Sequence, residues 1–433
     1  MRIALTTLGS RGDVQPFAAL GEELRKRGHE VALAAPAEFR ALATEARVEF
    51  AAVPGSPSEF LPGGARPSMD DAELVRSLRK STSAIRLSAA LRVLPELARD
   101  GETEVWQRLR EVAEGADLVV NAILTRPVAL TEEPPTPWCG VSWWPGSTTA
   151  AEPALGAWPV PLGPAYNRLT HGARASVEWL RARSAVNVIR RRRGLRPLGF
   201  RSPLRALGVE RPVLYPFSPA VYRPPADWPP SAHVTGYWYL DRFHSPPREL
   251  ARFVAAGSSP VVCTMGTFWA TDSEDRRARM VIGAARACGR RVVLVGGCSR
   301  QHAPDVFQIG ETDYRWLFPL ASTVVHHGGL GTTGEVVRAG VPQVVVPSGV
   351  DQPFWAARLR ELGVTATPLR APKLTERGLT TSILSALTDR RIAERAELLA
   401  HHVRADRGVE AAADVIERWG QGKDDKDDVD REG

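Results

Sequence analysis

Hydrophobic and polar positions along the first part of the chain follow the order strand, helix, strand. Arg2–Leu8 is an apolar run typical of a buried strand, and a polar turn, Gly9–Asp13, follows it. Val14–Arg27 repeats apolar residues at helical spacing and ends at Gly28, and Glu30–Ala35 is a second apolar run. This order predicts a parallel sheet with crossover helices. Further strands are predicted at Val48–Val53, Leu118–Asn121 and Trp138–Ser142.

The same pattern begins again near residue 260. Pro260–Thr264 is predicted to be a strand and Ser273–Cys288 an amphipathic helix. The other elements predicted for this half are strands at Arg291–Val295, Thr323–His326 and Gln343–Val346, and helices at Thr332–Ala339, Leu379–Leu387 and His401–Trp419. The repetition predicts a second α/β domain.

A proline-rich segment separates the two patterned halves. Arg211–Trp238 contains seven prolines, which favours an extended connector running into a strand. In the first half, Asp70–Val112 has a helical rhythm that Pro95 must break or kink. The predicted organisation is an N-terminal domain at 1–208, a linker at 209–235, a C-terminal domain at 236–420 and a charged, disordered tail at 421–433.

Composition and charge restrict the class of protein. Hydrophobic residues make up 43% and charged residues 24% of the 433 residues, as in soluble globular proteins, and no apolar run approaches the ~20 residues that span a bilayer. The four cysteines lack C-x-x-C spacing, so neither a disulfide framework nor a zinc site is indicated. The net charge of +7 comes without a nucleic-acid recognition motif, and the N-terminus lacks a secretory apolar run. We therefore expect a cytoplasmic protein that does not bind nucleic acid.

The segment Thr323–Trp355 carries the candidate chemistry. A predicted strand ends in His326 and His327, and four glycines follow within seven residues, ahead of a predicted helix. A turn from a strand into a helix N-terminus binds anions, because unpaired N–H groups point outward there and the helix dipole favours negative charge. Gly329 permits close approach of a phosphate, Thr332 supplies a hydroxyl and His327 supplies an imidazole N–H. The turn is predicted to bind a diphosphate.

A second interpretation of this turn is a dinucleotide site. Gly329–Gly334 matches G-x-G-x-x-G, and Asp351, about 20 residues further on, could serve as the ribose acid of an NAD-dependent oxidoreductase. The histidine pair beside the turn and the lack of such glycines in the first β-unit argue against it. The lysine of a Walker motif is absent, which argues against Mg²⁺-dependent hydrolysis of nucleoside triphosphates.

Asp351 and Gln352 follow the next predicted strand. Loops beyond the carboxyl ends of parallel strands face the ligand, and a carboxylate beside an amide suits a group rich in hydroxyls. Alternatively, Asp351 caps the helix that Pro353 begins. The residues alone leave both interpretations open.

These motifs resemble a known family. The stretch His326–Leu362 is similar to the nucleotide-sugar-binding region of inverting family 1 glycosyltransferases, which have the GT-B fold. Gly9–Pro36, Pro161–Ala173 and Ser218–Trp238 resemble the bacterial natural-product and sterol-type branch, which includes the transferases that decorate glycopeptide antibiotics. The resemblance covers nearly the whole chain before the tail. It implies an α/β protein of two Rossmann-like domains that face each other across a cleft.

The resemblance also assigns donor-binding roles by position. The residues it places at the donor diphosphate are His327, Gly329, Thr332, Thr267, Ser10 and Arg11, the last of which could equally lie in a surface turn. Glu335 matches the ribose-binding glutamate, and Asp351 and Gln352 match the pair that holds the transferred sugar. Gly310 and Thr312 stand in the base-binding region, where the usual aromatic or Val-Pro platform is missing. The choice between uracil and thymine therefore stays open.

Asp13 is the predicted general base. Pro16 is expected in a first helical turn, which puts Asp13 at or just before the cap, so a capping role is open from the residues alone. The resemblance instead matches Asp13, in Gly9–Asp13, to the base that takes the proton of the acceptor hydroxyl. It implies attack opposite the leaving nucleoside diphosphate, with inversion. The phosphate turn has no acidic cluster that suits Mg²⁺, so we expect neither a metal nor a cofactor.

The acceptor is predicted from tryptophans. Trp143 and Trp144 follow a predicted strand and could stack on a hydrophobic acceptor or serve as core anchors. The predicted function is transfer of a sugar from a UDP- or TDP-activated donor to a hydroxyl of a lipophilic small molecule, such as a polyketide, macrolide, glycopeptide or sterol. The alternatives are the NAD-dependent oxidoreductase, a non-catalytic GT-B partner of another transferase, and a nucleotide-sugar epimerase.

Overall fold

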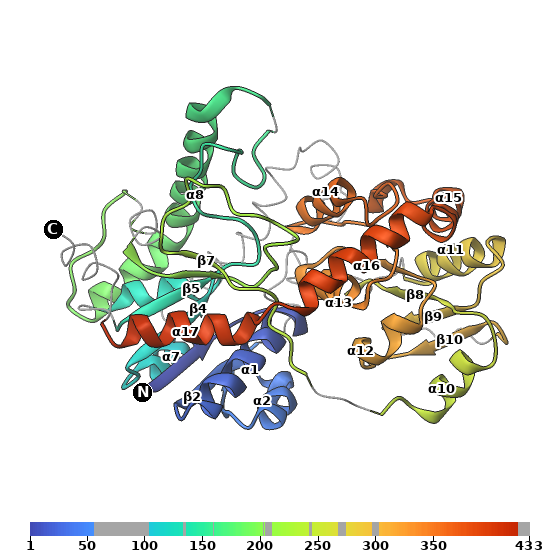
Figure 1. Cartoon of the computed structure of the whole chain (residues 1–433). Coiled ribbons are helices and arrows are strands. Elements are labelled where there is room, and N and C mark those ends of the chain that lie inside the picture. Colours follow the sequence, from blue (N-terminus) through green and yellow to red (C-terminus); the bar gives the residue numbers. More distant parts are fainter. Residues whose placement is uncertain are drawn as a thin grey trace, which may run out of the picture. The chain divides into compact units, whose positions relative to one another are not determined.

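The chain forms two compact units in a computed structural model (Figure 1). The residues that the structure describes are 1–55, 104–132, 136–158, 160–201, 203, 210–241, 245–266, 274–296 and 303–422. The first unit comprises Met1–Pro219, Arg223–Leu240 and Arg407–Gly433, and the second comprises Ala220–Tyr222 and Asp241–Asp406. Most of the helix predicted at Asp70–Val112, and the tail after residue 422, lie outside the described residues.

The first unit is built on a parallel sheet of seven strands in the order β3-β2-β1-β4-β5-β6-β7. The strands are β1 (Arg2–Thr6), β2 (Glu30–Pro36), β3 (Glu49–Val53), β4 (Leu118–Ala122), β5 (Trp138–Val141), β6 (Val213–Tyr215) and β7 (Ala232–Val234). The strand order reverses between β1 and β4. Ligands of open α/β sheets bind beyond the carboxyl ends of the strands at such a switch point.

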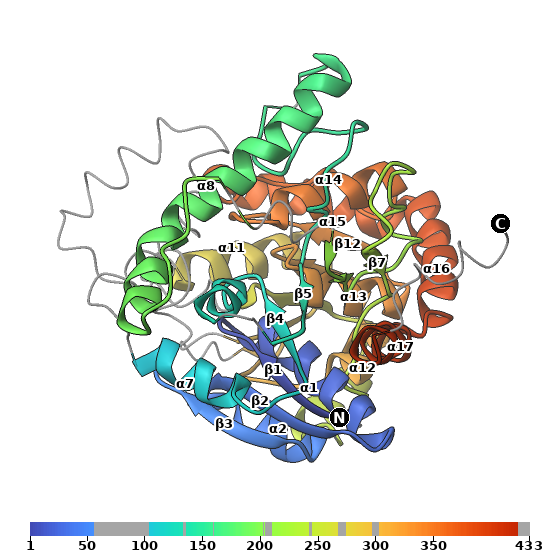
Figure 2. The same cartoon turned by 90° about the vertical axis from the view of Figure 1, so that its left-hand side faces the viewer.

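Helices pack on both faces of this sheet. They are α1 (Arg11–Lys26), α2 (Arg40–Ala46), α7 (Glu104–Ala113), α8 (Gly163–Arg192, the long green helix in Figure 2), α17 (Gly408–Gly420) and the short η1 (Ala37–Phe39) and η2 (Arg126–Thr131). Leu5 of β1 points to α1, where a Cβ on Gly21 would lie 3.1 Å from it. Ala4 points to the other face and shares a buried cluster with Trp106 of α7 and Trp179 of α8. This alternation explains why Ile3, Ala4 and Leu5, in the middle of β1, are all apolar.

The second unit holds a parallel sheet of five strands in the order β10-β9-β8-β11-β12. The strands are β8 (Val261–Thr264), β9 (Val292–Val295), β10 (Val306–Ile309), β11 (Thr323–His326) and β12 (Gln343–Val345). The helices are α10 (Arg248–Ala255), α11 (Glu274–Ala287), α12 (Tyr314–Leu317), η4 (Phe318–Leu320), α13 (Leu330–Ala339), α14 (Gln352–Leu362), η5 (Ala371–Lys373), α15 (Glu376–Thr388) and α16 (Arg390–Arg404). The order reverses between β8 and β11, so the loops after these two strands meet at this sheet's switch point.

Two predicted segments fold differently from the prediction. The proline-rich segment Arg211–Trp238 forms β6 and β7, which extend the first sheet; each is three residues long, and the prolines lie outside them. The helix predicted at His401–Trp419 is divided into α16 and α17. The division lies before Gly408, where a Cβ would come within 2.1 Å of the Tyr237 carbonyl oxygen. Only glycine permits this close approach.

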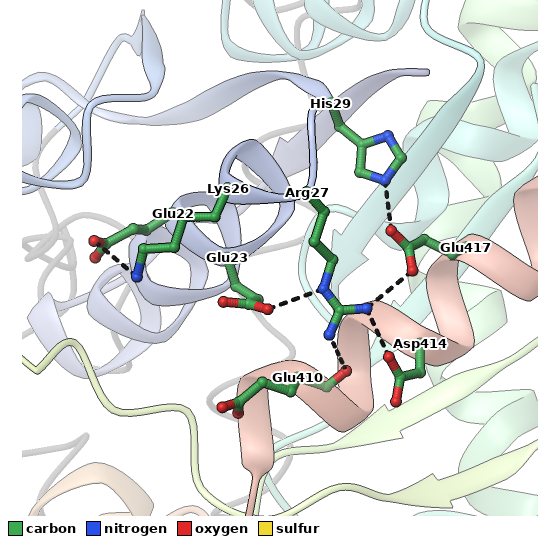
Figure 3. A network of polar contacts seen from close by, with 8 residues as sticks. All are labelled: Glu22, Glu23, Lys26, Arg27, His29, Glu410, Asp414 and Glu417. Carbon is green, nitrogen blue, oxygen red and sulfur yellow. Dashed lines mark hydrogen bonds and ion pairs between the residues drawn. The ribbon is translucent and has the colours of Figure 1, made fainter.

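Charged side chains tie the C-terminal helix α17 to α1 within the first unit (Figure 3). Arg27 follows α1, and its guanidinium donates to Glu23 at 2.9 Å, Asp414 at 2.6 Å, Glu417 at 2.9 Å and the Glu410 carbonyl at 3.1 Å. His29 Nε2 lies 2.8 Å from the second oxygen of Glu417. The Arg27 side chain is 21% exposed, so solvent screens these bonds less than those of a fully exposed pair.

We predict that Arg27→Met lowers the free energy of unfolding by about 1–2 kcal/mol, because several partly buried acceptors lose their donor together. The midpoint of thermal unfolding should fall by about 2–4 °C. Arg390→Met is the matched control, since Arg390 is 92% exposed and its ion-pair partner among the described residues is Glu394, one turn away. Equal midpoints for the two variants would show that the network does not hold α17.

Candidate active site

The loop from β1 into α1 places Asp13 at the carboxyl edge of the first sheet. Gly9 has a φ of 124°, and a Cβ there would lie 2.4 Å from Asp13 Oδ2, so a side chain at this position would displace the carboxylate. Ser10 is the N-cap of α1. Its backbone N–H and its hydroxyl donate to Asp13 Oδ2, at 2.7 and 3.0 Å. The carboxylate is therefore held in one orientation.

The helix begins earlier than predicted. Pro16 is the sixth residue of α1 instead of part of its first turn, and Asp13 is the third residue instead of the cap, because Ser10 takes the capping position. Arg11 is exposed, and its Nε donates to Gln15 at 2.9 Å. Burial raises the pKa of Asp13 to about 6, against the opposing effect of the two hydrogen bonds from Ser10. Such a carboxylate is ionised at neutral pH and close to the pKa that suits a general base.

The two predicted acceptor tryptophans lie in the interior. Trp143 is 8% and Trp144 7% exposed, and the Trp143 ring packs edge-on against Phe17 of α1 with the ring centroids 6.0 Å apart. These contacts are those of core anchors. Their role toward an acceptor stays a prediction.

In the second unit, β11 ends in His326 and a glycine turn leads into α13. Gly328 has a φ of 84°, and a Cβ on it would lie 2.8 Å from Val345. His326 is fully buried; its Nδ1 accepts from the Gly328 N–H at 3.2 Å, so its Nε2 donates to the Gln343 side chain at 2.8 Å. Gly329 is the N-cap of α13. The turn therefore directs the first N–H groups of α13 outward, as an anion site requires.

His327 lies beside these N–H groups. Its ring is 9% exposed and lies between two glycines. A Cβ on Gly266 would lie 2.9 Å from the ring, and a Cβ on Gly329 would lie 2.4 Å from Nε2. Burial first, and then the neighbouring His326, lower the pKa of His327 to about 3, while a hydrogen bond with the Thr264 backbone opposes the shift. The imidazole is therefore neutral near pH 7 and can donate a hydrogen bond but no charge.

Two threonine hydroxyls flank the same helix start. Thr332 is half-buried, and the buried Thr333 hydroxyl has no hydrogen-bond partner among the described residues. Thr267, which was also predicted to face the diphosphate, lies outside the described residues, although Gly266 just before it packs against His327. Backbone N–H groups, hydroxyls and a neutral imidazole together suit a phosphate group.

Glu335, one turn into α13, stands in a cluster of charges. Burial raises its pKa to about 7; Arg338 opposes this shift, Asp241 and Asp313 add to it, and Arg315 opposes it. Arg338 is already bonded to Asp241, with Nη2 2.6 Å from Oδ1. Glu335 is therefore a hydrogen-bond acceptor above about pH 7 and a neutral acid below it.

The predicted base-binding residues follow β10. Gly310 is exposed and Thr312 is half-buried, and the Thr312 hydroxyl oxygen is buried without a hydrogen-bond partner among the described residues. Both lie in the loop that ends at Asp313, a neighbour of Glu335. Asp313 thus links the predicted base-binding loop to the predicted ribose-binding residue Glu335.

Asp351 and Gln352 lie at the start of α14. Gln352 is 2% exposed, and its Oε1 accepts from the Ser348 N–H at 2.8 Å and the Gly349 N–H at 3.3 Å. Asp351 Oδ2 accepts from the Trp355 indole at 3.0 Å and makes no capping bond to the helix. The amide nitrogen of Gln352 and the carboxylate of Asp351 are thus the groups that can meet sugar hydroxyls.

Sequence reasoning missed the residues that hold these groups in place. Gly266 packs on His327, and Trp355 orients Asp351. Gly266 directly precedes Thr267, which is predicted to face the diphosphate. A tryptophan four residues after an acid in a helix gave a usable signal for the second contact.

Comparisons with known proteins agree with this geometry. The model of the glycosyltransferase family 28 N-terminal domain matches residues 3–93, and that of the erythromycin biosynthesis protein CIII-like C-terminal domain matches residues 300–417. The chain is 46% identical over 425 residues to O-mycaminosyltylonolide 6-deoxyallosyltransferase of Streptomyces fradiae, covering 97% of this chain and 98% of that protein. It is 30% identical to the sterol 3-beta-glucosyltransferase of Candida albicans, covering 96% of this chain but only 27% of that longer protein.

Solved structures show the same fold. Spinosyn rhamnosyltransferase SpnG has a TM-score of 0.64 at 22% identity, with 96% of this chain and all of that chain covered. The SsfS6 glycosyltransferase of Streptomyces sp. SF2575 has a TM-score of 0.60 at 19% identity, over 96% of this chain and 99% of that chain.

The chain is therefore a GT-B glycosyltransferase. It belongs to the nucleotide-sugar-dependent family that includes the Streptomyces fradiae deoxyallosyltransferase. The NAD-dependent interpretation of Gly329–Gly334 is set aside by this membership, and a non-catalytic or epimerase role finds no support in these comparisons. None of the helices within the described ranges has the length and apolarity that crossing a membrane requires.

We predict that His327→Ala weakens nucleoside diphosphate binding by about tenfold, because one hydrogen bond to the diphosphate is lost. Gly329→Ala should have a similar effect, since its Cβ would displace the His327 ring. Calorimetric titration with TDP and UDP measures both. The control is His401→Ala, because His401 lies on the exposed face of α16. The neighbouring His326 is unsuitable as a control, because its replacement would leave the buried Gln343 side chain without its hydrogen-bond partner. Wild-type affinity in both variants would remove His327 from the phosphate site.

A second prediction concerns pH. If Glu335 accepts hydrogen bonds from ribose, nucleoside diphosphate affinity should fall as the pH drops through about 7, where the carboxylate gains a proton. Glu335→Gln should lose this dependence, and pyrophosphate, which has no ribose, should show the same pH profile with both proteins. Calorimetry between pH 6 and 8.5 tests this; identical profiles of the two proteins with TDP would contradict it.

Proposed function

We propose that this chain transfers a 6-deoxyhexose from a TDP-activated donor to a hydroxyl of a macrolide-type acceptor, with inversion and without a metal. The observation that carries the proposal is Asp13, a half-buried carboxylate with a pKa near 6 held by Ser10 at the carboxyl edge of β1. A base with such a pKa suits removal of a hydroxyl proton near neutral pH.

The donor assignment is supported by relatives and by the phosphate turn. The 46% identical relative is named as a 6-deoxyallosyltransferase, and solved structures of both SpnG and SsfS6 contain thymidine diphosphate. In this chain, His327, the N–H groups at Gly329 and the Thr332 hydroxyl would bind the diphosphate. Glu335 would bind the ribose.

The acceptor assignment is supported by the same relative. Its name identifies O-mycaminosyltylonolide as its acceptor, and SpnG has been solved with spinosyn aglycone. The sterol glucosyltransferases share 29–30% identity, so a sterol is a less favoured acceptor. The first unit, which carries Asp13, would bind the acceptor.

The mechanism follows from these groups. The acceptor oxygen attacks the anomeric carbon, the bond from that carbon to the diphosphate breaks, and Asp13 takes the hydroxyl proton. Negative charge grows on the leaving diphosphate, where the N-terminus of α13, Thr332 and the neutral His327 stabilise it. Asp351 and the Gln352 amide nitrogen hold the sugar hydroxyls. Because the glycine turn contains no acidic residue, we propose that no metal bridges the phosphates.

The proposal is tested by a transfer assay with TDP- and UDP-6-deoxyhexoses and with O-mycaminosyltylonolide as the first acceptor. Asp13→Asn should lower kcat by roughly 10²–10⁴-fold, because the amide cannot take the proton. Donor affinity should hardly change. The wild-type rate should have an acidic limb near pH 6 that the variant lacks, and EDTA should leave the rate unchanged.

Two controls sharpen this test. Ser10→Ala removes a hydrogen bond that favours the charged carboxylate, so the acidic limb should move to higher pH. Asp117→Asn changes an acid that accepts from the Arg2 backbone and should leave the profile unaltered. Transfer within a few-fold of wild type by Asp13→Asn would overturn the base assignment.

A further inference from the structure

Two side chains on the α7 and α8 face of the first sheet have donor groups without acceptors. Asn121 of β4 is 2% exposed; its Oδ1 accepts from the Thr6 hydroxyl at 2.8 Å, but its amide nitrogen is buried without a partner among the described residues. Arg126 begins η2, four residues after β4. Its guanidinium makes no hydrogen bond or ion pair with any described residue, and its Nε is buried.

The sheet register brings these two donors together. Asn121 pairs with Gly140 on the neighbouring strand β5, about 4.8 Å away, and paired positions point their side chains to the same face. The Arg126 guanidinium lies where the Gly140 side chain would be: a Cβ there would be 3.3 Å from Nη2 and 3.5 Å from Nε. The missing side chain at Gly140 therefore makes room for Arg126 beside the Asn121 amide.

The surroundings leave the positive charge uncompensated. Burial lowers the pKa of Arg126, and Glu178 of α8 is the acid that opposes this shift. The Glu178 carboxylate is, however, already bonded to Arg174, with Oε1 3.0 Å from Nη1. The nearby Tyr215 hydroxyl is bonded to Ser147 at 2.7 Å. Two arginines thus share one acid, and buried donors without acceptors are costly unless a further group joins them.

Asn121 also lines a cavity at the switch point between β1 and β4. The cavity is bordered mainly by apolar side chains of α7, β4 and η2, and its other polar linings are Thr6, Glu132 and Thr136. Its volume is about 10 Å³, the room of a single water-sized group, so it can take one oxygen atom but not a whole ligand.

We propose that Asn121 and Arg126 form a subsite that binds a carbonyl-type oxygen of the acceptor, in a ketone, an ester or a carboxylate. The inference rests on the proposed function, in which the first unit binds the acceptor. An amide NH₂ and a planar guanidinium offer donors only, so they match an oxygen that only accepts better than a hydroxyl, whose hydrogen would need an acceptor of its own. The pair would thus favour a lipophilic acceptor that carries a carbonyl group at this point over one that carries the corresponding alcohol.

Asn121→Asp is the informative variant. It keeps the acceptor of the Thr6 hydroxyl but replaces the NH₂ donors by a carboxylate that can pair with Arg126. The midpoint of thermal unfolding should rise, because the buried guanidinium gains a partner, while KM for a keto macrolactone rises by about 10- to 100-fold. The kcat should change little. Arg126→Met, of similar length and without charge, should raise the same KM.

The acceptors form the second arm of the test. Wild type should bind a keto macrolactone about tenfold more tightly than the same compound with that ketone reduced to an alcohol, and Arg126→Met should abolish the difference. An ester and its free acid distinguish a neutral carbonyl from a carboxylate as the preferred group. Arg183→Met is the matched control, because the Arg183 side chain already donates to the Leu198 and Gly199 carbonyls. Its acceptor KM should equal that of wild type.

Acceptor binding is measured by calorimetry as well as through the transfer rate. The proposed function and the proposed subsite can therefore be tested independently of each other. Wild type that binds the ketone in an Arg126-dependent way but transfers no sugar would support the subsite and contradict the proposed function. Active wild type, with ketone affinity unchanged in Asn121→Asp and Arg126→Met, would overturn the subsite. In that case the two donors would be satisfied by buried water.

Discussion

Every strand pairing in both sheets is parallel, and the placement of the functional groups depends on this constraint. Parallel strands require crossover connections, so the loops that lead from strands into helices gather at one edge of each sheet. Helix N-termini with unpaired N–H groups lie at that edge. In the first unit Asp13 lies at such a helix start, and in the second unit the glycine turn at Gly328 and Gly329 does. One topological rule thus places the proposed base of one unit and the proposed anion site of the other at equivalent edges of their sheets.

Burial then sets the charge of each group. It raises the pKa of Asp13 to about 6 and that of Glu335 to about 7, and it lowers that of His327 to about 3. The two acids therefore titrate near neutral pH, while the histidine stays uncharged. Stabilisation of a leaving diphosphate in this enzyme would rest on oriented N–H groups and hydroxyls instead of a cationic side chain, which places the demand on the geometry of the turn.

The connectivity of the two units explains why a single glycine, Gly408, is needed where the chain re-enters the first unit. The main body of the second unit, Asp241–Asp406, is inserted between segments of the first, and the chain returns to the first unit at Arg407. The close approach of Gly408 to the Tyr237 carbonyl makes this return possible, and Arg27 then fastens α17 to α1. The C-terminal helix is therefore part of the first fold, although it follows the second in sequence.

Several features could be predicted from the sequence because they depend on neighbouring residues. The strand Thr323–His326 was predicted with the bounds that it has, since a short apolar run followed by glycines leaves few alternatives. A glycine turn leading into a helix was predicted for the same reason, because glycine and strand-end patterns are local, although the helix begins at Leu330 instead of Thr332. The GT-B fold followed from the resemblance of motifs along the chain, and the comparisons confirm it.

Other features were decided only by the tertiary structure. Asp13 is the third residue of α1 because Ser10 is the N-cap. The pKa of Asp13 depends on the residues that bury its carboxylate. The sequence left open whether the tryptophans after β5 stack on a ligand or anchor the core, and the structure shows Trp143 packed on Phe17. Arg126 occupies the side-chain space at Gly140, which pairs with Asn121 through the register of β4 on β5, and no local pattern encodes this register. Patterns of neighbouring residues thus determine which elements form, whereas burial, charge and side-chain partners arise from long-range pairing.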